Sequence, residues 1–334
     1  MSANDCGSGG GAQTYTGLRI ASIFIILGTS MFGALFPVVA RRVPWLRVHI
    51  PSTMFLIAKY FGSGVIVATA FIHLLDPALQ ELSSPCLSPA WQEYPYALAI
   101  SLGSIFGIFV IEIFAFRWGT EVLRKAGVGA PQGHMHDIDG GRGQEIEKIQ
   151  GDAESGLENS SLGIEETDSQ ESAIGRILGV MILEFGVLLH SVLIGLTLAV
   201  DPDFKILFVV IIFHQMFEGL GVGSRLAYME LPRKYAMVPI IGACLYGITT
   251  PIGIAAGLGV RTTYNPNSTT ASIVSGVMDA FSSGILIYTG LVELMAHEFV
   301  FNKKMIEGPT KNLVLALGLM MLGVGLMALL GKWA

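Results

Sequence analysis

Two histidines and a glutamate stand inside long apolar stretches of this chain, where ionisable side chains are rare. His214 follows the run ILFVVIIF, and Glu218 lies four residues further on, so both side chains share one face of a helix. His190 lies in the preceding apolar stretch. A charge at the middle of a membrane-spanning helix costs about 2.5–3.5 kcal/mol on insertion scales, so such residues usually face a bundle interior or a water-filled cavity. The three residues therefore predict a divalent metal site between two neighbouring helices.

The donor types narrow the choice of metal. Imidazole and carboxylate ligands suit Zn2+, Fe2+ and Mn2+, and the absence of a thiolate from this set argues against Cu+. Each residue also has a plainer interpretation, as a buried polar group that hydrogen bonds to a neighbouring helix. The four-residue spacing of His214 and Glu218, with His190 at a similar depth, favours the metal site over that alternative.

Further polar residues near the ends of apolar stretches predict a path for the cation. We expect His73 and Asp76 to admit cations at the outer end of the second helix, and Glu293 and His297 to receive them at the inner end of the seventh. Asp279 and Ser283 lie nearer the outer half of that helix, four residues apart. For each, the alternative is an interfacial residue that reaches the headgroups. For Glu298 that alternative weighs at least as much as a ligand role.

The composition is that of an integral membrane protein. The 334-residue chain is 52% hydrophobic and 14% charged, with a mean hydropathy of +0.61, whereas soluble domains carry about 25% charged residues. An all-α fold with eight transmembrane helices is expected, because each apolar stretch is long enough to cross the roughly 30 Å hydrocarbon layer and none alternates like a barrel strand. The predicted spans are 18–40, 53–75, 96–118, 174–199, 206–227, 237–259, 272–296 and 312–331.

The distribution of positive charge predicts the orientation. With the N-terminus outside, most of the 20 lysines and arginines face the cytosol, and the outer ends hold only Arg19, Lys205, Arg261 and Lys332. Cytoplasmic loops carry such an excess. Both termini are therefore predicted to be extracytoplasmic, with residues 1–17 as an extracellular tail.

Three residues on the predicted outer side are open to modification. Cys6 and Cys86 would lie where disulfides form, and they are interpreted either as a disulfide or as two free thiols. Asn267 opens an Asn-Ser-Thr sequon in an outer loop and is a candidate for N-glycosylation.

A long polar segment separates the third and fourth spans. Residues 119–173 are rich in Gly, Ser, Glu and Asp, so we expect a disordered acidic cytosolic loop. His134 and His136 stand near its start, beside a methionine and an aspartate. They are interpreted either as a weak metal site for sensing or capture, or as solvated residues without a role.

The helix motifs resemble those of the ZIP (ZRT/IRT-like) metal transporters, in their plant and fungal branch. His190-Ser191-Val192-Leu193-Ile194-Gly195 is similar to the fourth-helix signature of that family, and His214-Gln215-Met216-Phe217-Glu218-Gly219 to the fifth. Phe71-Ile72-His73-Leu74-Leu75 resembles the second helix. The resemblance covers nearly all of the chain outside the tail and the acidic loop.

This resemblance implies a 3+2+3 arrangement, in which helices one to three (18–118) and six to eight (within 174–334) form inverted repeats around helices four and five. It implies that His190, His214 and Glu218 bind the transported metal, with Ser191 and Gln215 beside them. Some relatives have acidic residues where this chain has Ile194 and Gln215, so one metal ion is expected here. The implied cargo is Zn2+, with Fe2+ or Mn2+ as alternatives, and the implied location is the plasma membrane.

The expected function is therefore secondary uptake of Zn2+ into the cytosol by alternating access, with zinc as substrate and no cofactor. The first alternative is an intramembrane zinc hydrolase, which needs a general base and a bound water; the H-E-x-x-H string is absent, and an enzyme is not expected. The second is a metal-sensing receptor that never releases its ion. The expected partners are the metal ion and the lipid bilayer, without nucleic acid, and a homodimer is left open.

Overall fold

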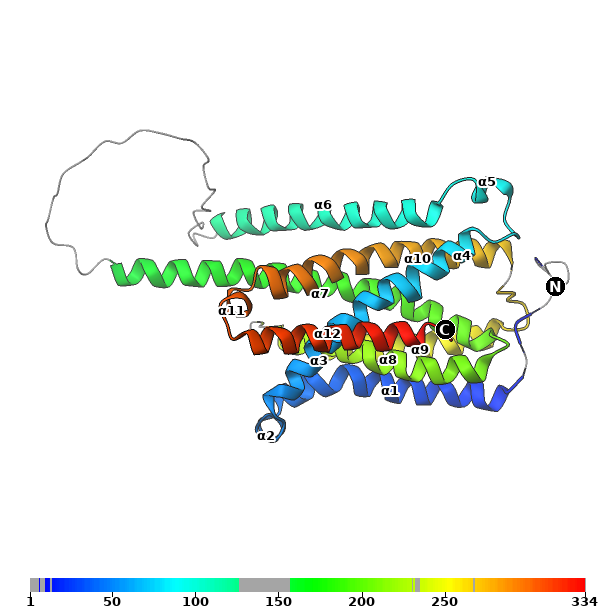
Figure 1. Cartoon of the computed structure of the whole chain (residues 1–334), viewed down its shortest axis with the longest axis horizontal. Coiled ribbons are helices and arrows are strands. Elements are labelled where there is room, and N and C mark those ends of the chain that lie inside the picture. The colour runs from blue at the N-terminus through cyan, green and yellow to red at the C-terminus, as the bar shows by residue number, and fades with distance from the viewer. Residues whose placement is uncertain are drawn as a thin grey trace, which may run out of the picture. The chain divides into compact units, whose positions relative to one another are not determined.

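The computed structural model describes residues 6, 10–12, 14–125, 157–229, 231, 235–266 and 268–333, and all regular structure in this part of the chain is helical (Figure 1). The chain divides into two compact units. The first contains Met1–Phe109 and Gly179–Ala334, and the second contains Val110–Leu178. All candidate site residues that the structure describes belong to the first unit.

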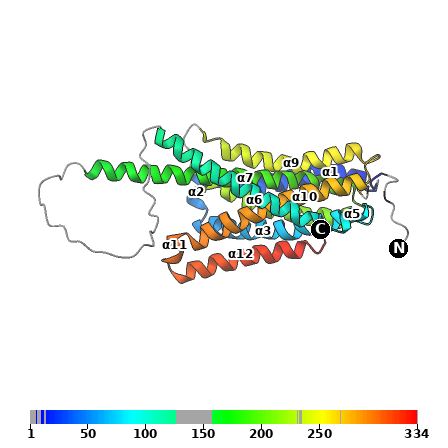
Figure 2. The same ribbon diagram turned by 90° about the horizontal axis from the view of Figure 1, so that it is seen from above.

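The described helices follow one another in a fixed order along the chain. They are α1 (Thr16–Arg42), α2 (Pro44–His49), α3 (Ser52–Ala68), η1 (Thr69–Leu75), α4 (Asp76–Leu82), α5 (Pro89–Gln92), α6 (Tyr96–Lys125), α7 (Leu157–Val200), α8 (Phe204–Ala227), α9 (Val238–Val260), α10 (Thr269–Thr289), η3 (Gly290–Val300), α11 (Lys303–Ile306) and α12 (Thr310–Leu330). Within the described residues, eight helical stretches are long and apolar enough to cross a membrane, which confirms the predicted number. In the first unit these helices run side by side along one common direction (Figure 2).

Two spans contain a stretch of π-helix that the apolar pattern does not reveal. The second span continues through η1 and α4 to Leu82, and the seventh continues through η3 to Val300. In η1 the amide of Asp76 donates to the carbonyl of Phe71, five residues earlier. A proline clashes with the carbonyl four residues before it, and for Pro77 that carbonyl belongs to His73. The wider π turn relieves this clash, and π turns are frequent at functional sites.

Two helices run further than their predicted spans. α6 continues to Lys125 and α7 begins at Leu157, so 119–125 and 157–173 are helical where a disordered loop was expected. Once a spanning helix has formed, each added residue gains a backbone hydrogen bond without a new nucleation cost. His134, His136 and Asn267 lie outside the described residues.

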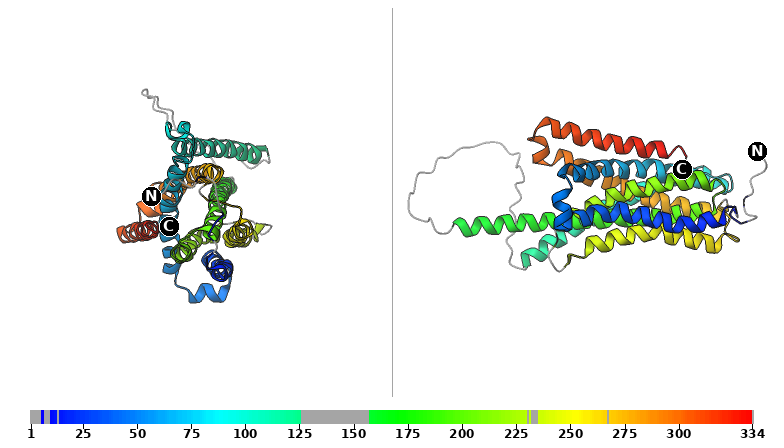
Figure 3. Two further views of the ribbon diagram at one scale, coloured as in Figure 1. Left: turned by 90° about the vertical axis from the view of Figure 1, so that its right-hand side faces the viewer. Right: turned by 90° about the horizontal axis from the view of Figure 1, so that it is seen from below.

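Glycines let the helices around α8 approach closely. Seen end-on, α8 lies beside α1 and α3 (Figure 3). A Cβ atom on Gly62 of α3 would collide with the backbone of Gly221 of α8, and one on Gly223 would collide with the backbone of Ala34 of α1. A Cβ atom on Gly323 of α12 would likewise collide with the carbonyl of Phe61 in α3. Small residues at such contacts are the usual means of packing helices in membranes.

We expect Gly62→Ala to destabilise the protein, because the added methyl group forces α3 away from α8. Overpacking of this kind costs about 1–3 kcal/mol, which should lower the melting temperature of the purified protein in detergent. Gly325→Ala on α12 is the matched control, since its Cβ would meet no atom within 4 Å. Equal melting temperatures for the two variants would contradict the close contact.

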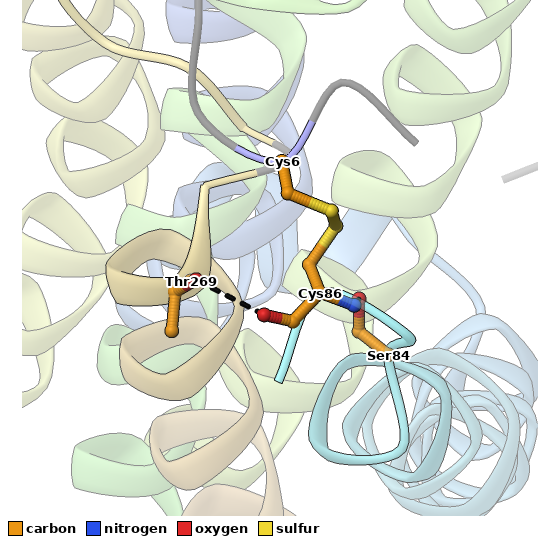
Figure 4. Close-up of a disulfide and its surroundings, with 4 residues drawn as sticks. All are labelled: Cys6, Ser84, Cys86 and Thr269. Carbon is orange, nitrogen blue, oxygen red and sulfur yellow. Dashed lines mark hydrogen bonds between the residues drawn. A yellow bond between two sulfur atoms is a disulfide. The ribbon is translucent and has the colours of Figure 1, made fainter. Parts of the chain in front are cut away.

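The disulfide end of the bundle, defined by Cys6, Cys86, Val200 and Arg261, is held together by covalent and backbone contacts. Cys6 and Cys86 form a disulfide, and Thr269 at the start of α10 donates to the carbonyl of Cys86 at 3.1 Å (Figure 4). The amide of Gly11 donates to the carbonyl of Arg261, and that of Ala12 to the carbonyl of Val200. The segment before α1 is thereby tied to the ends of α7 and α9 and to the α4–α5 loop.

A buried arginine strengthens the same end. Arg19 of α1 is fully buried and donates to the carbonyls of Leu198 at 2.9 Å and Asp201 at 2.6 Å. Its guanidinium also lies 4.5 Å from the centre of the Phe204 ring. Burial raises the pKa of the Asp201 carboxyl, an effect that the positive charge of Arg19 partly offsets. The start of α1 is thus fastened to the α7–α8 connection.

The disulfide predicts a specific pattern of thiol labelling. The chain has three cysteines, and Cys244 is the free one in the described structure. In denaturant without reductant, a maleimide mass tag should therefore add once per chain, and after reduction three times. Cys86→Ser should give two additions with or without reductant. Three additions without reductant would contradict the disulfide.

Candidate metal site

Three potential ligands converge where α7 and α8 pass each other. His190 comes from α7, and His214 and Glu218 come from α8. One ligand atom from each lies within 4.8 Å of the other two, and all three residues are buried. Each histidine is ten residues from the disulfide end of its helix, which places it about 15 Å along the axis at 1.5 Å per residue. The cluster therefore lies near the middle of a hydrocarbon layer roughly 30 Å thick.

Four polar atoms of this cluster are buried without hydrogen bonds. Both ring nitrogens of His190, Nε2 of His214 and Oε1 of Glu218 have no hydrogen-bond partner among the described residues. His214 Nε2 lies 3.7 Å from Glu218 Oε2, too far for a hydrogen bond but suitable for two ligands of one ion. Buried polar atoms almost always have a partner, and a bound ion explains such exceptions. Two imidazoles and one carboxylate fit a divalent cation of the zinc type.

A hydrogen-bond network on α9 supports the cluster from the side and takes Gln215 away from it. The side-chain amide nitrogen of Gln215 donates to Thr250 Oγ1. The hydroxyl of Tyr246 lies 2.7 Å from Gln215 Oε1 and 3.4 Å from Glu218 Oε2. Gln215 is therefore oriented toward α9, although it follows His214 directly. Ser191 is fully buried next to His190, and its hydroxyl has no hydrogen-bond partner in the described residues.

His73 lies at the candidate site and not at the mouth of the path where the sequence placed it. Its ring meets the ring of His214 edge to face, with centroids 4.8 Å apart. Its Nε2 lies 3.1 Å from the carbonyl of Met327 in α12. The predicted second span ended at 75, whereas the helix continues to Leu82, so His73 is an interior residue. The turn of η1 thus places it against His214, one of the three potential ligands.

Asp279 also reaches the candidate site. Its Oδ1 lies 3.6 Å from Nδ1 of His190, and both residues are buried. The other predicted path residues on the same side remain separate. Asp76 is exposed and accepts a hydrogen bond from Gln80 at 2.7 Å. Ser283 is buried and donates to Ser101 of α6 at 3.0 Å.

Glu298 joins two cationic side chains at the opposite end of the bundle. Its carboxylate lies 2.5 Å from Lys59 Nζ of α3 and 3.0 Å from Arg225 Nη1 of α8. Arg225 also donates to Ser63 of α3 at 2.9 Å. We call Lys59, Arg225 and Glu298 the ionic cluster; their side chains are 21%, 12% and 14% exposed. Glu298 is thus held by two cations and is not a free ligand.

Glu293 and His297, the remaining predicted path residues, lie on η3. Nε2 of His297 is 4.0 Å from Oε1 of Glu293, and the imidazole is 57% exposed. The carboxylate of Glu293 also lies against Gly179 of α7. The pair lies outside the candidate metal site, and the carboxylate of Glu293 also acts electrostatically on Arg225 of the ionic cluster.

Sequence reasoning missed the partners of two predicted residues, Gln215 and Glu298. Tyr246 and Thr250 contact Gln215 from α9, and Lys59 and Arg225 bind Glu298. Their spacing along a helix could have indicated some of these residues. Tyr246 and Thr250 are four residues apart on one helix face, and Arg225 lies seven residues after Glu218, on the same face of α8. Their partners come from distant segments, so the spacing alone could not identify the contacts.

The chain is similar to known zinc transporters over nearly its whole length. Residues 16–331 match the family described as ZIP Zinc transporter. The chain is 42% identical to zinc-regulated transporter 1 of Saccharomyces cerevisiae, over 95% of its own length and 88% of that protein. It is 40% identical to zinc-regulated transporter 1 of Schizosaccharomyces pombe, over 96% and 86% of the two chains. It is 37% identical to zinc transporter 3 of Arabidopsis thaliana, over 97% and 86%.

Proposed function

Because the chain belongs to the ZIP zinc transporter family, we propose that it carries Zn2+ across the plasma membrane into the cytosol by alternating access, without ATP. The family consists of transporters and not of enzymes, so zinc is a substrate and not a cofactor. The observation that supports this mechanism best is the buried cluster of His190, His214 and Glu218 near the middle of the spans. Its unpaired ligand atoms suit an ion that binds and leaves.

The direction of transport rests on the orientation of the chain. The excess of lysine and arginine at one side favours a cytosolic position for the end with Arg225 and Glu298. The disulfide of Cys6 and Cys86 supports an extracytoplasmic position for the other end, where conditions are oxidising. The proposed entry of zinc is therefore from the disulfide end.

A path from that end passes residues of decreasing exposure. Asp76 is exposed and attracts the hydrated cation, and His73 and Asp279 lie deeper, beside the three ligands. On the other side, the proposed exit runs past the ionic cluster and the pair of Glu293 and His297. Contacts across glycines such as Gly62 and Gly221 give α8 a smooth surface on which to shift. A transport site must bind its ion strongly enough to load it and weakly enough to release it.

The cargo is proposed to be mainly Zn2+, with Fe2+ and Mn2+ as competitors, because imidazole and carboxylate donors accept all three ions. One ion is proposed per chain, since Gln215 faces Thr250 and Tyr246 instead of offering a second site.

Purified protein reconstituted in vesicles that enclose a zinc-sensitive dye tests this proposal directly. Saturable entry of zinc without ATP, reduced by added Fe2+ or Mn2+, is the expected result. Zinc binding in detergent without entry into the vesicles would favour a metal-sensing receptor and overturn the transport proposal. Empty vesicles and vesicles with His214→Ala protein serve as controls.

A further inference from the structure

Asp279 is a buried carboxylate for which the three-ligand site gives no role. It lies halfway along α10, and its Oδ1 has no hydrogen-bond partner in the described structure. Its polar neighbour is His190, whose Nδ1 lies 3.6 Å from Oδ1. Neither atom has a hydrogen bond, although both are buried. An aspartate at the centre of a spanning helix costs about 2.5–3.5 kcal/mol on insertion scales, so this position calls for a function.

The geometry divides the two nitrogens of His190 between two tasks. A neutral imidazole has one N–H donor and one nitrogen with a free lone pair. A small rotation of either side chain would bring the 3.6 Å contact between Nδ1 and Oδ1 into hydrogen-bond range. When Nδ1 carries the hydrogen and donates to Asp279, Nε2 keeps its lone pair for a metal. A histidine that binds a metal almost always donates its other N–H to a carboxylate, a carbonyl or water, and this partner sets its orientation and basicity.

We propose that Asp279 is a positioning residue that accepts the Nδ1–H of His190 and so directs Nε2 at the transported zinc. This proposal rests on the proposed function and adds a fourth residue to the site. Asp279 does not bind the ion itself. It acts through His190, by fixing the tautomer and the direction of the ring.

The backbone of α10 is well held, as a positioning role requires. One turn beyond Asp279, Ser283 donates to Ser101 of α6, and Ser104 of α6 donates to the carbonyl of Phe281 at 2.7 Å. A Cβ on Gly284 would collide with the carbonyl of Ser101, so α10 and α6 are in close contact here. Asp279 therefore projects from a fixed element.

The pair has a consequence for release, because its members lie on different helices. His190 belongs to α7 and Asp279 to α10. Any shift of α7 against α10 removes the acceptor from Nδ1, lets the imidazole rotate, and weakens its hold on zinc. Affinity is then highest in the arrangement seen here and lower once the helices have moved.

Two substitutions separate the position of the acceptor from its charge. Asp279→Asn keeps an oxygen in place for Nδ1–H and loses the charge. Asp279→Glu keeps the charge and moves the oxygen by one methylene. Thr289→Ala is the matched control, since it removes a buried hydroxyl of α10 that donates to the carbonyl of Ile285 in the same helix.

The measurements are the KM and maximal rate of zinc entry in reconstituted vesicles, and the affinity of the purified protein for Co2+ from its visible absorption. Loss of a partner behind a ligand typically costs 10- to 100-fold in affinity. We expect Asp279→Glu to raise KM and weaken Co2+ binding by about that factor, with little change in maximal rate. Asp279→Asn should change KM and Co2+ affinity by a much smaller factor, and Thr289→Ala should match the wild type in both.

The order of the two variants decides the outcome. If the Asp279→Glu variant binds Co2+ as tightly as the Asp279→Asn variant, or more tightly, the position of the acceptor does not determine the affinity. That result overturns the proposal. If wild-type protein moves no zinc at all, the proposed transport function fails, while the Co2+ affinities of the same variants still test the pair of Asp279 and His190.

Discussion

Replacing Glu218 or His214 by alanine should reduce zinc uptake by more than about 100-fold, because loss of a direct ligand exceeds the 10- to 100-fold cost of losing a group behind one. Each variant leaves two of the three ligands that now lie within 4.8 Å of one another. Two protein ligands cannot compensate for the hydration free energy that a zinc ion loses when it is buried. Initial uptake of radioactive zinc into cells, at matched surface amounts of protein, is the measurement.

The side chains around Glu218 predict a further distinction. Glu218→Gln keeps the size of the side chain and can still contact the hydroxyl of Tyr246, now at 3.4 Å. It loses the charge that a divalent cation needs, so it should remain as inactive as Glu218→Ala while folding as well as the wild type.

His49→Ala is the matched control for the histidine. His49 is an exposed histidine at the end of α2, outside the candidate site, so its removal should leave uptake unchanged. Near-normal uptake by Glu218→Ala would move the transport site away from α8 and contradict the proposed mechanism.

The second large effect is expected on stability, from Glu298→Ala. This change leaves Lys59 and Arg225 mostly buried without their shared carboxylate. Breaking a buried ion pair by removing one partner costs about 3–5 kcal/mol, because an uncompensated charge remains. The melting temperature of the purified protein in detergent should fall clearly. Glu307→Ala is the control, since this exposed glutamate lies near the same end of the bundle.

Removing all three charges separates the ionic cluster from a simple loss of packing. A variant with Lys59→Met, Arg225→Met and Glu298→Leu has no charge left in the ionic cluster, and such replacements are often neutral or stabilising. We therefore expect it to melt at a higher temperature than Glu298→Ala. A lower temperature for the triple variant would show that the three side chains contribute chiefly by packing.

The long apolar stretches made the general architecture predictable. A membrane leaves few ways to satisfy the backbone, so a stretch of about 20 apolar residues forms a helix whatever surrounds it. The number of spans, the all-α class and the family resemblance are confirmed. The pairing of His214 with Glu218 was equally predictable, because a four-residue spacing on one helix places both side chains on one face.

Residues near the ends of predicted spans were less predictable. His73 was expected at the mouth of the path and lies against His214. The predicted span ended at 75 after 23 residues, whereas the helix continues past Pro77 to Leu82 through a π turn. A wide turn changes both the length of a span and the direction of the side chains after it.

The sequence by itself determined which segments cross the membrane and which ionisable residues lie deep within them, since both follow from local composition and from the period of a single helix. Only the tertiary structure decided which of those residues meet. It turned Gln215 toward Thr250, brought Asp279 of α10 to His190 of α7, and gave Glu298 its two cations. Such contacts depend on the rotation and depth at which separate helices pack, and those are set by small residues such as Gly62 and Gly221 on facing surfaces and not by the spacing within either helix.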